Sequence, residues 1–159
     1  MKSAILLVLI LLGLFAAAAS VQAVEMAEEG EMAEVDYMAK ADEFMMSLPE
    51  NGFYRMEMQD LIDAFDAGDD NLVILDVRPS SLFEIGHIPD SMNIPDPVLV
   101  SSMEMVPEDK KIAVVCQMDT NSAYAVSILR IFGDRDAWIV VGGVPGWVEA
   151  GRELVTTEI

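Results

Sequence analysis

"IAVVCQMDTNSAYAVSILR", which runs from Ile112 to Arg130, is the stretch that decides the fold of this chain. Residues 112–115 form a continuous apolar run, which is typical of a strand buried on both faces of a parallel sheet. From Ser122 onward, apolar residues recur at the spacing of a helix. A buried strand followed closely by a helix predicts an α/β domain. Cys116, at the carboxyl end of that strand, leads into the mostly polar loop that joins the two elements.

The same alternation continues on both sides of this stretch. Buried strands or brief extended segments are predicted at 53–56, 72–77, 91–95 and 137–141. Helices are predicted at 57–68, 79–86, 97–105 and 142–151. Strands that alternate with helices indicate a largely parallel sheet. Because ligands bind at the carboxyl ends of strands in open sheets of this kind, Cys116 lies where a ligand is expected.

The N-terminal segment differs from the rest in composition. Lys2 precedes an apolar run from Ala4 to Ala19, and small residues stand at Val21 and Ala23. This pattern predicts a secretory signal peptide over residues 1–23 that is cut after Ala23. Cleavage would leave an extracytoplasmic protein, either periplasmic or secreted. If the segment is not cut, the alternative is an N-terminal membrane anchor.

A length of 159 residues suits one domain of ordinary size. After the signal peptide we expect an acidic linker over 24–36, an N-terminal helix over 37–50 and the main domain over 51–159. The helix is predicted by apolar residues at helical spacing, and the sequence "PENG" ends it.

The charge balance is strongly acidic. The formal net charge is −19 at pH 7, which argues against nucleic acid as a partner, because binding its phosphates needs a basic surface. Membrane contact is expected only through an uncleaved N-terminal segment. Met26, Met32 and Met38 suggest copper(I), but their spacing does not fit one helix face and no His or Cys is near. We therefore expect no metal and no other cofactor.

Cys116 is the only cysteine in the chain, so no intrachain disulfide exists. An odd cysteine in an exported protein is either reactive or pairs between chains. Backbone N–H groups of the following loop, together with the positive end of the helix dipole, can stabilise a thiolate at this place. The alternative is a buried cysteine that acts as a small apolar residue.

Strand, cysteine, loop and helix occur together in cysteine-dependent phosphatases, oxidoreductases and sulfurtransferases. Two of these classes are disfavoured by the loop residues. A Cys-x-x-Cys exchanger needs a cysteine where the chain has Asp119, and a phosphatase needs an arginine where it has Ser122. His87, the only histidine, is disfavoured as a protease base because nothing in the sequence orients it.

Four features in order resemble the rhodanese-like domain family. They are "LDVRPSSLFEIGHIPDSMNIP" from Leu75, "VVCQMDTNS" from Val114, the alanine- and leucine-containing helix that follows it, and "GGVPGW" from Gly142. The resemblance implies a rhodanese-like doubly wound α/β domain with a five-stranded, mainly parallel central sheet flanked by helices. It also implies that Cys116 accepts sulfane sulfur as a persulfide and passes it to a thiophilic acceptor.

The resemblance also assigns roles to individual residues. Cys116 matches the nucleophile. Backbone amides that would stabilise the bound sulfur belong to Gln117, Met118, Asp119, Thr120, Asn121 and Ser122. Asp76, Arg78 and His87 match structural positions near the site. We expect Arg78 to pair with Glu84, and His87 to bond to backbone in its tight turn.

The loop departs from the family at two positions. Asp119 stands where many members have glycine, and Asn121 stands where many have a cation. If the Asp119 carboxylate points inward, at about 6 Å and an effective dielectric constant of about 20, it opposes a thiolate by roughly 3 kcal/mol. A helix start returns about 0.3 to 1 kcal/mol. If the carboxylate points to water or caps the helix, screening reduces the penalty to a fraction of that value.

These features leave two functional hypotheses. The first is a sulfurtransferase or persulfide carrier that uses Cys116 with a small sulfur donor or thiol acceptor, or with a partner protein. Because the loop lacks a cation, we expect poor thiosulfate turnover. The second is a non-catalytic rhodanese-like module that binds a partner or senses redox state.

Overall fold

The structure, a computed structural model, describes residues 35–157. The predicted signal peptide over 1–23 and most of the predicted linker over 24–36 lie outside these residues. From Tyr37 onward the chain forms one compact unit. Within the described part, no helix has both the length and the apolar character needed to cross a membrane.

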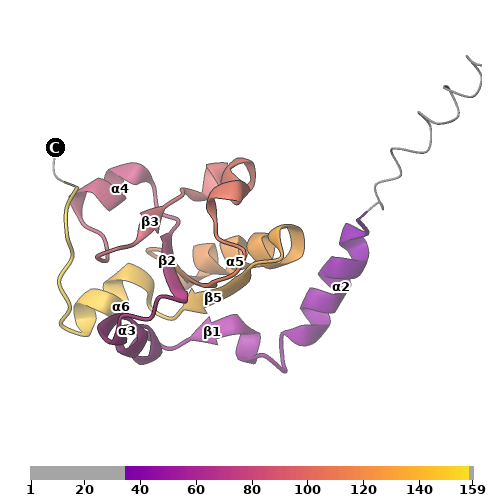
Figure 1. The fold of residues 1–159 in the computed structure, drawn as a ribbon, viewed down its shortest axis with the longest axis horizontal. Coiled ribbons are helices and arrows are strands. Elements are labelled where there is room, and N and C mark those ends of the chain that lie inside the picture. The colour runs from indigo at the N-terminus through magenta and orange to yellow at the C-terminus, as the bar shows by residue number, and fades with distance from the viewer. Residues whose placement is uncertain (1–34, 158–159) are drawn as a thin grey trace, which may run out of the picture. The chain divides into compact units, whose positions relative to one another are not determined.

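A parallel sheet forms the centre of this unit (Figure 1). Within residues 35–157 its five strands lie in the order β1-β5-β4-β2-β3, and every neighbouring pair is parallel. The strands are β1 (Arg55–Met56), β2 (Leu72–Asp76), β3 (Met92–Asn93), β4 (Lys111–Val115) and β5 (Asp136–Val140). The predicted α/β class and the five-stranded parallel sheet are confirmed.

Helices cover both faces of the sheet, and each layer closes one half of the core. One face is covered by α2 (Tyr37–Ser47), the 3-10 helices η2 (Asp96–Val98) and η3 (Val100–Met105), and α5 (Asp119–Gly133). The other face is covered by α3 (Met58–Ala67) and α6 (Gly143–Glu149). The short helix α4 (Ser80–Ile85) follows β2, and the 3-10 helix η1 (Gly52–Tyr54) precedes β1. The doubly wound arrangement follows from this division.

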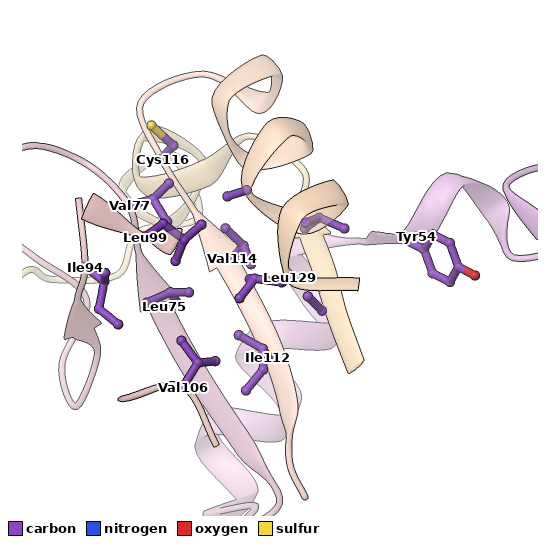
Figure 2. Close-up of a cluster of buried hydrophobic side chains, with 13 residues drawn as sticks. Tyr54, Leu75, Val77, Ile94, Leu99, Val106, Ile112, Val114, Cys116 and Leu129 are labelled. Atoms are coloured by element: carbon purple, nitrogen blue, oxygen red, sulfur yellow. The ribbon is translucent and has the colours of Figure 1, made fainter. Parts of the chain in front are cut away.

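Side-chain alternation in β4 decides which layer receives the cysteine. Ile112 and Val114 pack in the cluster beneath α5, whereas Ala113 and Val115 pack in the cluster on the opposite face. Because successive side chains of a strand point to opposite faces, Cys116 falls on the same side as Val114. Figure 2 shows Cys116 at the end of this row of buried side chains.

Three helix boundaries differ from the prediction. α2 ends at Ser47, because Pro49 disfavours helical backbone in the residue before it. Residues 97–105 form 3-10 helices with a kink at Ser102, whose φ of −114° is not helical. α5 begins at Asp119 rather than at Ser122, since an acidic residue suits the positive first turn of a helix.

Candidate active site

Three strand ends meet at the candidate active site. β2 and β5 flank β4, and all three strands end at the carboxyl edge of the sheet. The Val77 N–H donates to the Val115 carbonyl at 3.0 Å, and the Val144 N–H donates to the Cys116 carbonyl at 3.0 Å. The backbone around Cys116 is therefore held by the segments that follow both neighbouring strands.

Cys116 itself is buried, with 4% of the residue exposed. It belongs to an apolar cluster that includes Val77, Leu99 and Ala125. In Figure 2 its sulfur points away from the rest of the cluster, toward the loop that leads into α5. Cys116 is buried because strand alternation turns its side chain toward the layer of α5.

The loop after Cys116 is exposed and carries free backbone donors. Among the described residues, the N–H groups of residues 117–120 have no hydrogen-bond acceptor. The first N–H groups of a helix lack intrahelical partners, and no side chain caps α5. Asn121 differs, since its N–H donates to the Met118 carbonyl at 3.1 Å. Most of the predicted amides thus remain available to an anion at this helix start, but that of Asn121 does not.

Asp119 directs its carboxylate away from the sheet interior. The residue is exposed, and its Oδ1 accepts a hydrogen bond from the Gly142 N–H at 2.9 Å. The side chain is exposed, as the second alternative considered from the sequence requires, but its carboxylate bonds to the turn after β5 rather than capping α5. Solvent screens this charge, so the penalty of roughly 3 kcal/mol for an inward carboxylate does not apply in full.

Two glycines allow the turn after β5 to approach the cysteine. Gly142 and Gly143 have φ values of 84° and 52°, in the left-handed region that glycine adopts most readily. A Cβ atom at Gly143 would overlap the carbonyl oxygen of Cys116. The motif "GGVPGW" therefore reflects a close backbone contact that fixes the position of Cys116.

Ser122 carries a buried polar group at the start of α5. It is fully buried, and its hydroxyl has no hydrogen-bond partner among the residues that the structure describes. Ala125, Val126 and Leu129 continue the same helix face and pack in one cluster with Cys116. Because α5 starts at the carboxyl edge and runs back along the sheet, Ser122 is the member of this face nearest to the end of β4. A buried hydroxyl without a partner is unusual, and a polar ligand atom at this place would satisfy it.

Asp96 is a site residue that the sequence patterns do not reveal. It begins η2, and its Oδ2 accepts a hydrogen bond from Nδ2 of Asn121 at 3.3 Å. Burial raises the pKa of Asp96 above its ordinary value, and the hydrogen bond from Asn121 offsets part of this rise. The two residues are 25 positions apart, so no local motif signals their contact.

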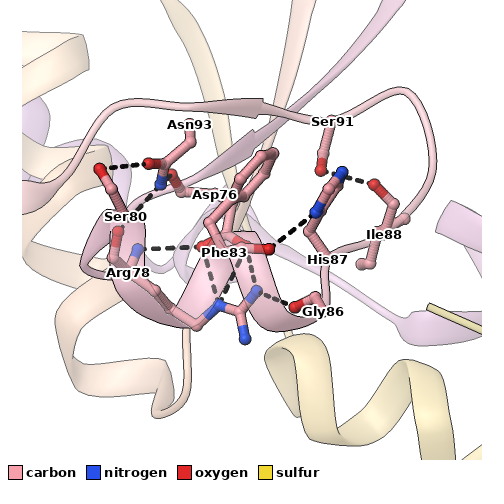
Figure 3. A network of polar contacts seen from close by, with 9 residues as sticks. All are labelled: Asp76, Arg78, Ser80, Phe83, Gly86, His87, Ile88, Ser91 and Asn93. Atoms are coloured by element: carbon pink, nitrogen blue, oxygen red, sulfur yellow. Dashed lines mark hydrogen bonds and ion pairs between the residues drawn. The ribbon is translucent and has the colours of Figure 1, made fainter. Parts of the chain in front are cut away.

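The end of β2 holds a buried ion pair (Figure 3). Nη2 of Arg78 donates to Oδ2 of Asp76 at 2.6 Å, and Nε lies 3.0 and 2.9 Å from the two carboxylate oxygens. Nη2 also donates to the Gly86 carbonyl at 2.8 Å. The predicted pairing of Arg78 with Glu84 is wrong, because Asp76 is buried beside the guanidinium whereas Glu84 is exposed.

Hydrogen bonds from the side chain of Asn93 tie β3 to this pair. Its Nδ2 donates to the carbonyls of Asp76 and Arg78, each at 2.9 Å. Nearby, Nδ1 of His87 lies 2.8 Å from the Phe83 carbonyl oxygen, which confirms the predicted backbone contact (Figure 3). Within residues 35–157, no group of three or more His, Cys, Asp or Glu side chains is placed to hold a metal ion.

Comparisons with known proteins agree with this arrangement. The rhodanese-like domain family matches residues 57–150, and the chain belongs to that family. A solved structure of a rhodanese-related protein from Thermoplasma volcanium is 32% identical to this chain, with a TM-score of 0.57. The match covers 64% of this chain and 96% of that one.

Several curated relatives are sulfurtransferases. Thiosulfate sulfurtransferase GlpE of Pseudomonas syringae pv. syringae is 33% identical over 75 residues, which cover 47% of this chain and 71% of that protein. Adenylyltransferase and sulfurtransferase MOCS3-1 of Zea mays is 32% identical over 114 residues, or 67% of this chain. This chain spans only 23% of the Zea mays protein. The relatives support a role related to sulfur transfer for the domain.

Proposed function

We propose that this protein is a sulfurtransferase or persulfide carrier in which Cys116 accepts sulfane sulfur and passes it to a thiol. The observation that carries the proposal is the set of backbone N–H groups over residues 117–120, which have no acceptor among the described residues and directly follow the cysteine. Such donors at a helix start stabilise a negative charge on sulfur. The Asp119 carboxylate bonds to the Gly142 N–H and so does not occupy the N–H groups of residues 117–120.

The proposed chemistry has two steps, each of which exchanges one sulfur–sulfur bond for another. The Cys116 thiolate attacks the terminal sulfur of a polysulfide, a new S–S bond forms, and the shortened polysulfide leaves as an anion. An acceptor thiolate then attacks the outer sulfur of the Cys116 persulfide. The acceptor becomes a persulfide, and the Cys116 thiolate leaves with the electron pair of the broken bond.

Thiosulfate is a poor donor in this proposal. It is a dianion, and the loop offers backbone N–H groups but no cationic side chain between Gln117 and Leu129 to bind it. The carboxylates of Asp96 and Asp119 lie beside the loop and disfavour anionic donors further. Neutral persulfides of small or protein thiols would avoid this repulsion.

Mass spectrometry of the purified protein after incubation with polysulfide or thiosulfate tests the proposal. We expect the protein to gain one sulfur atom from a short polysulfide, which in its protonated form carries a single negative charge near neutral pH, and to gain it more slowly from the thiosulfate dianion. Cys116→Ser should gain none, and because the chain has no other cysteine this control is unambiguous. A wild-type protein that gains no sulfur from either donor would rule the proposal out.

Burial of Cys116 favours a second candidate function. With 4% of the residue exposed, the thiol could be a packing residue in a non-catalytic rhodanese-like binding module. Alkylation of the folded protein with iodoacetamide separates the two functions. A catalytic thiol should be modified within minutes at neutral pH, whereas a packing residue should react only after denaturation.

We also propose that the chain is exported and cut after Ala23. This rests on the charged, apolar and small-residue order of the first 23 residues, which lie outside the described part of the chain. N-terminal sequencing of the protein from its native cells tests it. A mature protein that begins at Val24 is expected, and one that begins at Met1 in the cytoplasmic fraction would contradict export.

A further inference from the structure

We propose that the partner of Cys116 is a protein whose thiol is surrounded by positive charge, and that it docks on the rim of the site. The rim consists of Asp96, Val98, Met118 and Asp119. That sulfur is transferred to this partner rests on the proposed function. The preference for a basic partner rests only on the charges and exposed side chains of the rim.

The two edges of the sheet differ in charge. Arg78 is the only cation that the topology places at the carboxyl edge within residues 35–157, and it is buried in its pair with Asp76. The other cations of the described chain lie at the amino edge or pair with residues there: Lys40, Arg55, Lys110, Lys111, Arg130, Arg135 and Arg152. Within residues 35–157, therefore, no exposed positive charge at this edge balances the acids around the cysteine.

Carboxylates stand at the ends of three strands on the same edge. Glu57 follows β1, Asp96 follows β3, and Asp119 follows β4. Glu57 and Asp119 are exposed, and Asp96 is half-buried. Because parallel strands end at one edge, these charges add to one negative field along the carboxyl edge of the sheet.

Apolar side chains lie exposed between these acids. Met118 is 61% exposed and Val98 is 45% exposed. The hydrogen bond between Asp96 and Asn121 brings η2 against the start of α5. Val98 lies two residues after Asp96, and Met118 lies three residues before Asn121, so both apolar side chains belong to segments that this bond joins. The rim thus combines exposed apolar area with negative charge, and a partner that carries apolar and basic groups would complement both.

A small cationic thiol would neutralise the acids but would leave Met118 and Val98 in water. A protein covers both. Its thiol must project from the surface, since Cys116 lies beneath its loop with 4% of the residue exposed. Positive charge around that thiol would raise the rate of encounter, and the effect would weaken as salt screens it.

The test measures how fast Cys116 reacts with synthetic peptides whose central cysteine is activated as a 2-pyridyl disulfide. The Cys116 thiolate attacks the peptide sulfur, a new disulfide forms, and pyridine-2-thiolate leaves and is followed by absorbance. Three peptides are compared, in which the cysteine is flanked by arginine and leucine, by glutamate and leucine, or by arginine and glycine. This readout does not require a persulfide.

At low salt we expect the arginine–leucine peptide to react about tenfold faster than the glutamate–leucine peptide. The ratio should shrink as salt is added. The double variant Asp96→Asn, Asp119→Asn should lower it severalfold while keeping the acceptor oxygens that bond Asn121 and Gly142.

Two matched variants serve as controls. Asp69→Asn with Asp70→Asn removes two exposed charges just before β2, at the opposite edge, and should leave the ratio unchanged. Met118→Gln should reduce the advantage of the leucine peptide over the glycine peptide, without altering the preference for arginine over glutamate.

Equal rates for the basic and acidic peptides, or a ratio that the rim double variant does not change, would overturn the docking proposal. The two proposals fail in different ways. A protein that gains sulfur from polysulfide but does not discriminate between peptides refutes the docking proposal alone. A protein that discriminates between peptides but gains no sulfur refutes the proposed function and leaves the docking surface in place.

Discussion

The ends of β2 and β4 are neighbours in one sheet, yet they are built in opposite ways. Asp76 pairs with Val115 in the strand register, so both ends lie at the same height on the carboxyl edge. After β2 the polar groups are closed on one another, because Arg78 binds both the Asp76 carboxylate and the Gly86 carbonyl. After β4 the backbone N–H groups of residues 117–120 have no acceptor among the described residues.

The difference shows how one sheet edge provides both rigidity and reactivity. At the end of β2 the Asp76 carboxylate accepts hydrogen bonds from the Arg78 guanidinium two residues later. Because the pair is buried, removing either partner would leave an uncompensated charge. After β4 the Asp119 carboxylate bonds to the Gly142 N–H instead, so the N–H groups of residues 117–120 have no acceptor within the described chain and remain free for an anion. Backbone hydrogen bonds from Val77 and Val144 hold the open end against its neighbours.

The largest expected effect comes from breaking the closed end. Arg78→Ala leaves the buried carboxylate of Asp76 without its partner, and we expect the free energy of unfolding to fall by about 3 to 5 kcal/mol. Urea denaturation followed by circular dichroism measures it. Lys40→Ala is the control, because it breaks an exposed pair with Asp134 and should cost less than about 1 kcal/mol. Similar losses for the two variants would show that the end of β2 is not the rigid one.

The second prediction concerns the contact that holds the open end. Gly143→Ala introduces a Cβ atom that overlaps the Cys116 carbonyl oxygen at a φ of 52°. We expect a loss of about 3 kcal/mol and a clear drop in the rate of sulfur uptake. Gly151→Ala is the control, because its φ of 79° is also left-handed but nothing lies within 4 Å of the new atom. It should cost about 1 kcal/mol and leave sulfur uptake unchanged.

Ser122→Ala sharpens the comparison, because it removes the unpartnered hydroxyl beside the open end. We expect the free energy of unfolding to rise by about 1 kcal/mol, since an unsatisfied buried group is lost.

The same variant should also shorten the lifetime of the persulfide on Cys116, because the Ser122 hydroxyl would donate a hydrogen bond to it. Mass spectrometry over time measures this decay. Ser127→Ala removes a hydroxyl of the same helix that already donates to the Ala123 carbonyl, and it should not change the decay. Equal decay in both variants would exclude Ser122 from the site.

The smallest effect is expected at the rim. The raised pKa of Asp96 means that the folded protein holds this proton more tightly than the unfolded chain does. The ionised carboxylate therefore lowers stability as pH rises through the window between the ordinary value of 3.8 and the raised value. Asp96→Asn should raise the free energy of unfolding at pH 7 by less than about 1 kcal/mol, because the group is only half-buried. The gain should vanish below pH 3.8, and a gain that persists there would contradict a charge effect.

Local patterns in the sequence were sufficient for most of the fold. The apolar run before Cys116 and the helical spacing after Ser122 predict β4 and α5, and both are observed with a boundary shift at the start of the helix. The helix predicted over 57–68 is observed as α3, and Gly68 is the left-handed residue that caps it. These features succeed because each depends on residues close together in the chain.

Predictions about contacts between distant residues were less successful. Glu84 was chosen as the partner of Arg78 on sequence proximity, but burial selects Asp76. The hydrogen bond between Asp96 and Asn121 was not anticipated, because it depends on how η2 packs against α5. The orientation of Asp119 likewise depends on the turn after β5, which lies more than twenty residues further along the chain.

The sequence by itself determined the parallel α/β sheet and placed the single cysteine at its carboxyl edge, since hydrophobic periodicity encodes strands, helices and their order. Only the tertiary structure decided that Cys116 is buried, that Asp119 bonds to Gly142, and that the described part of the chain places no exposed cation at the edge around the site. Those features arise when separate strand ends are packed side by side. A sequence pattern fixes which face a side chain occupies, but it does not fix what that face meets.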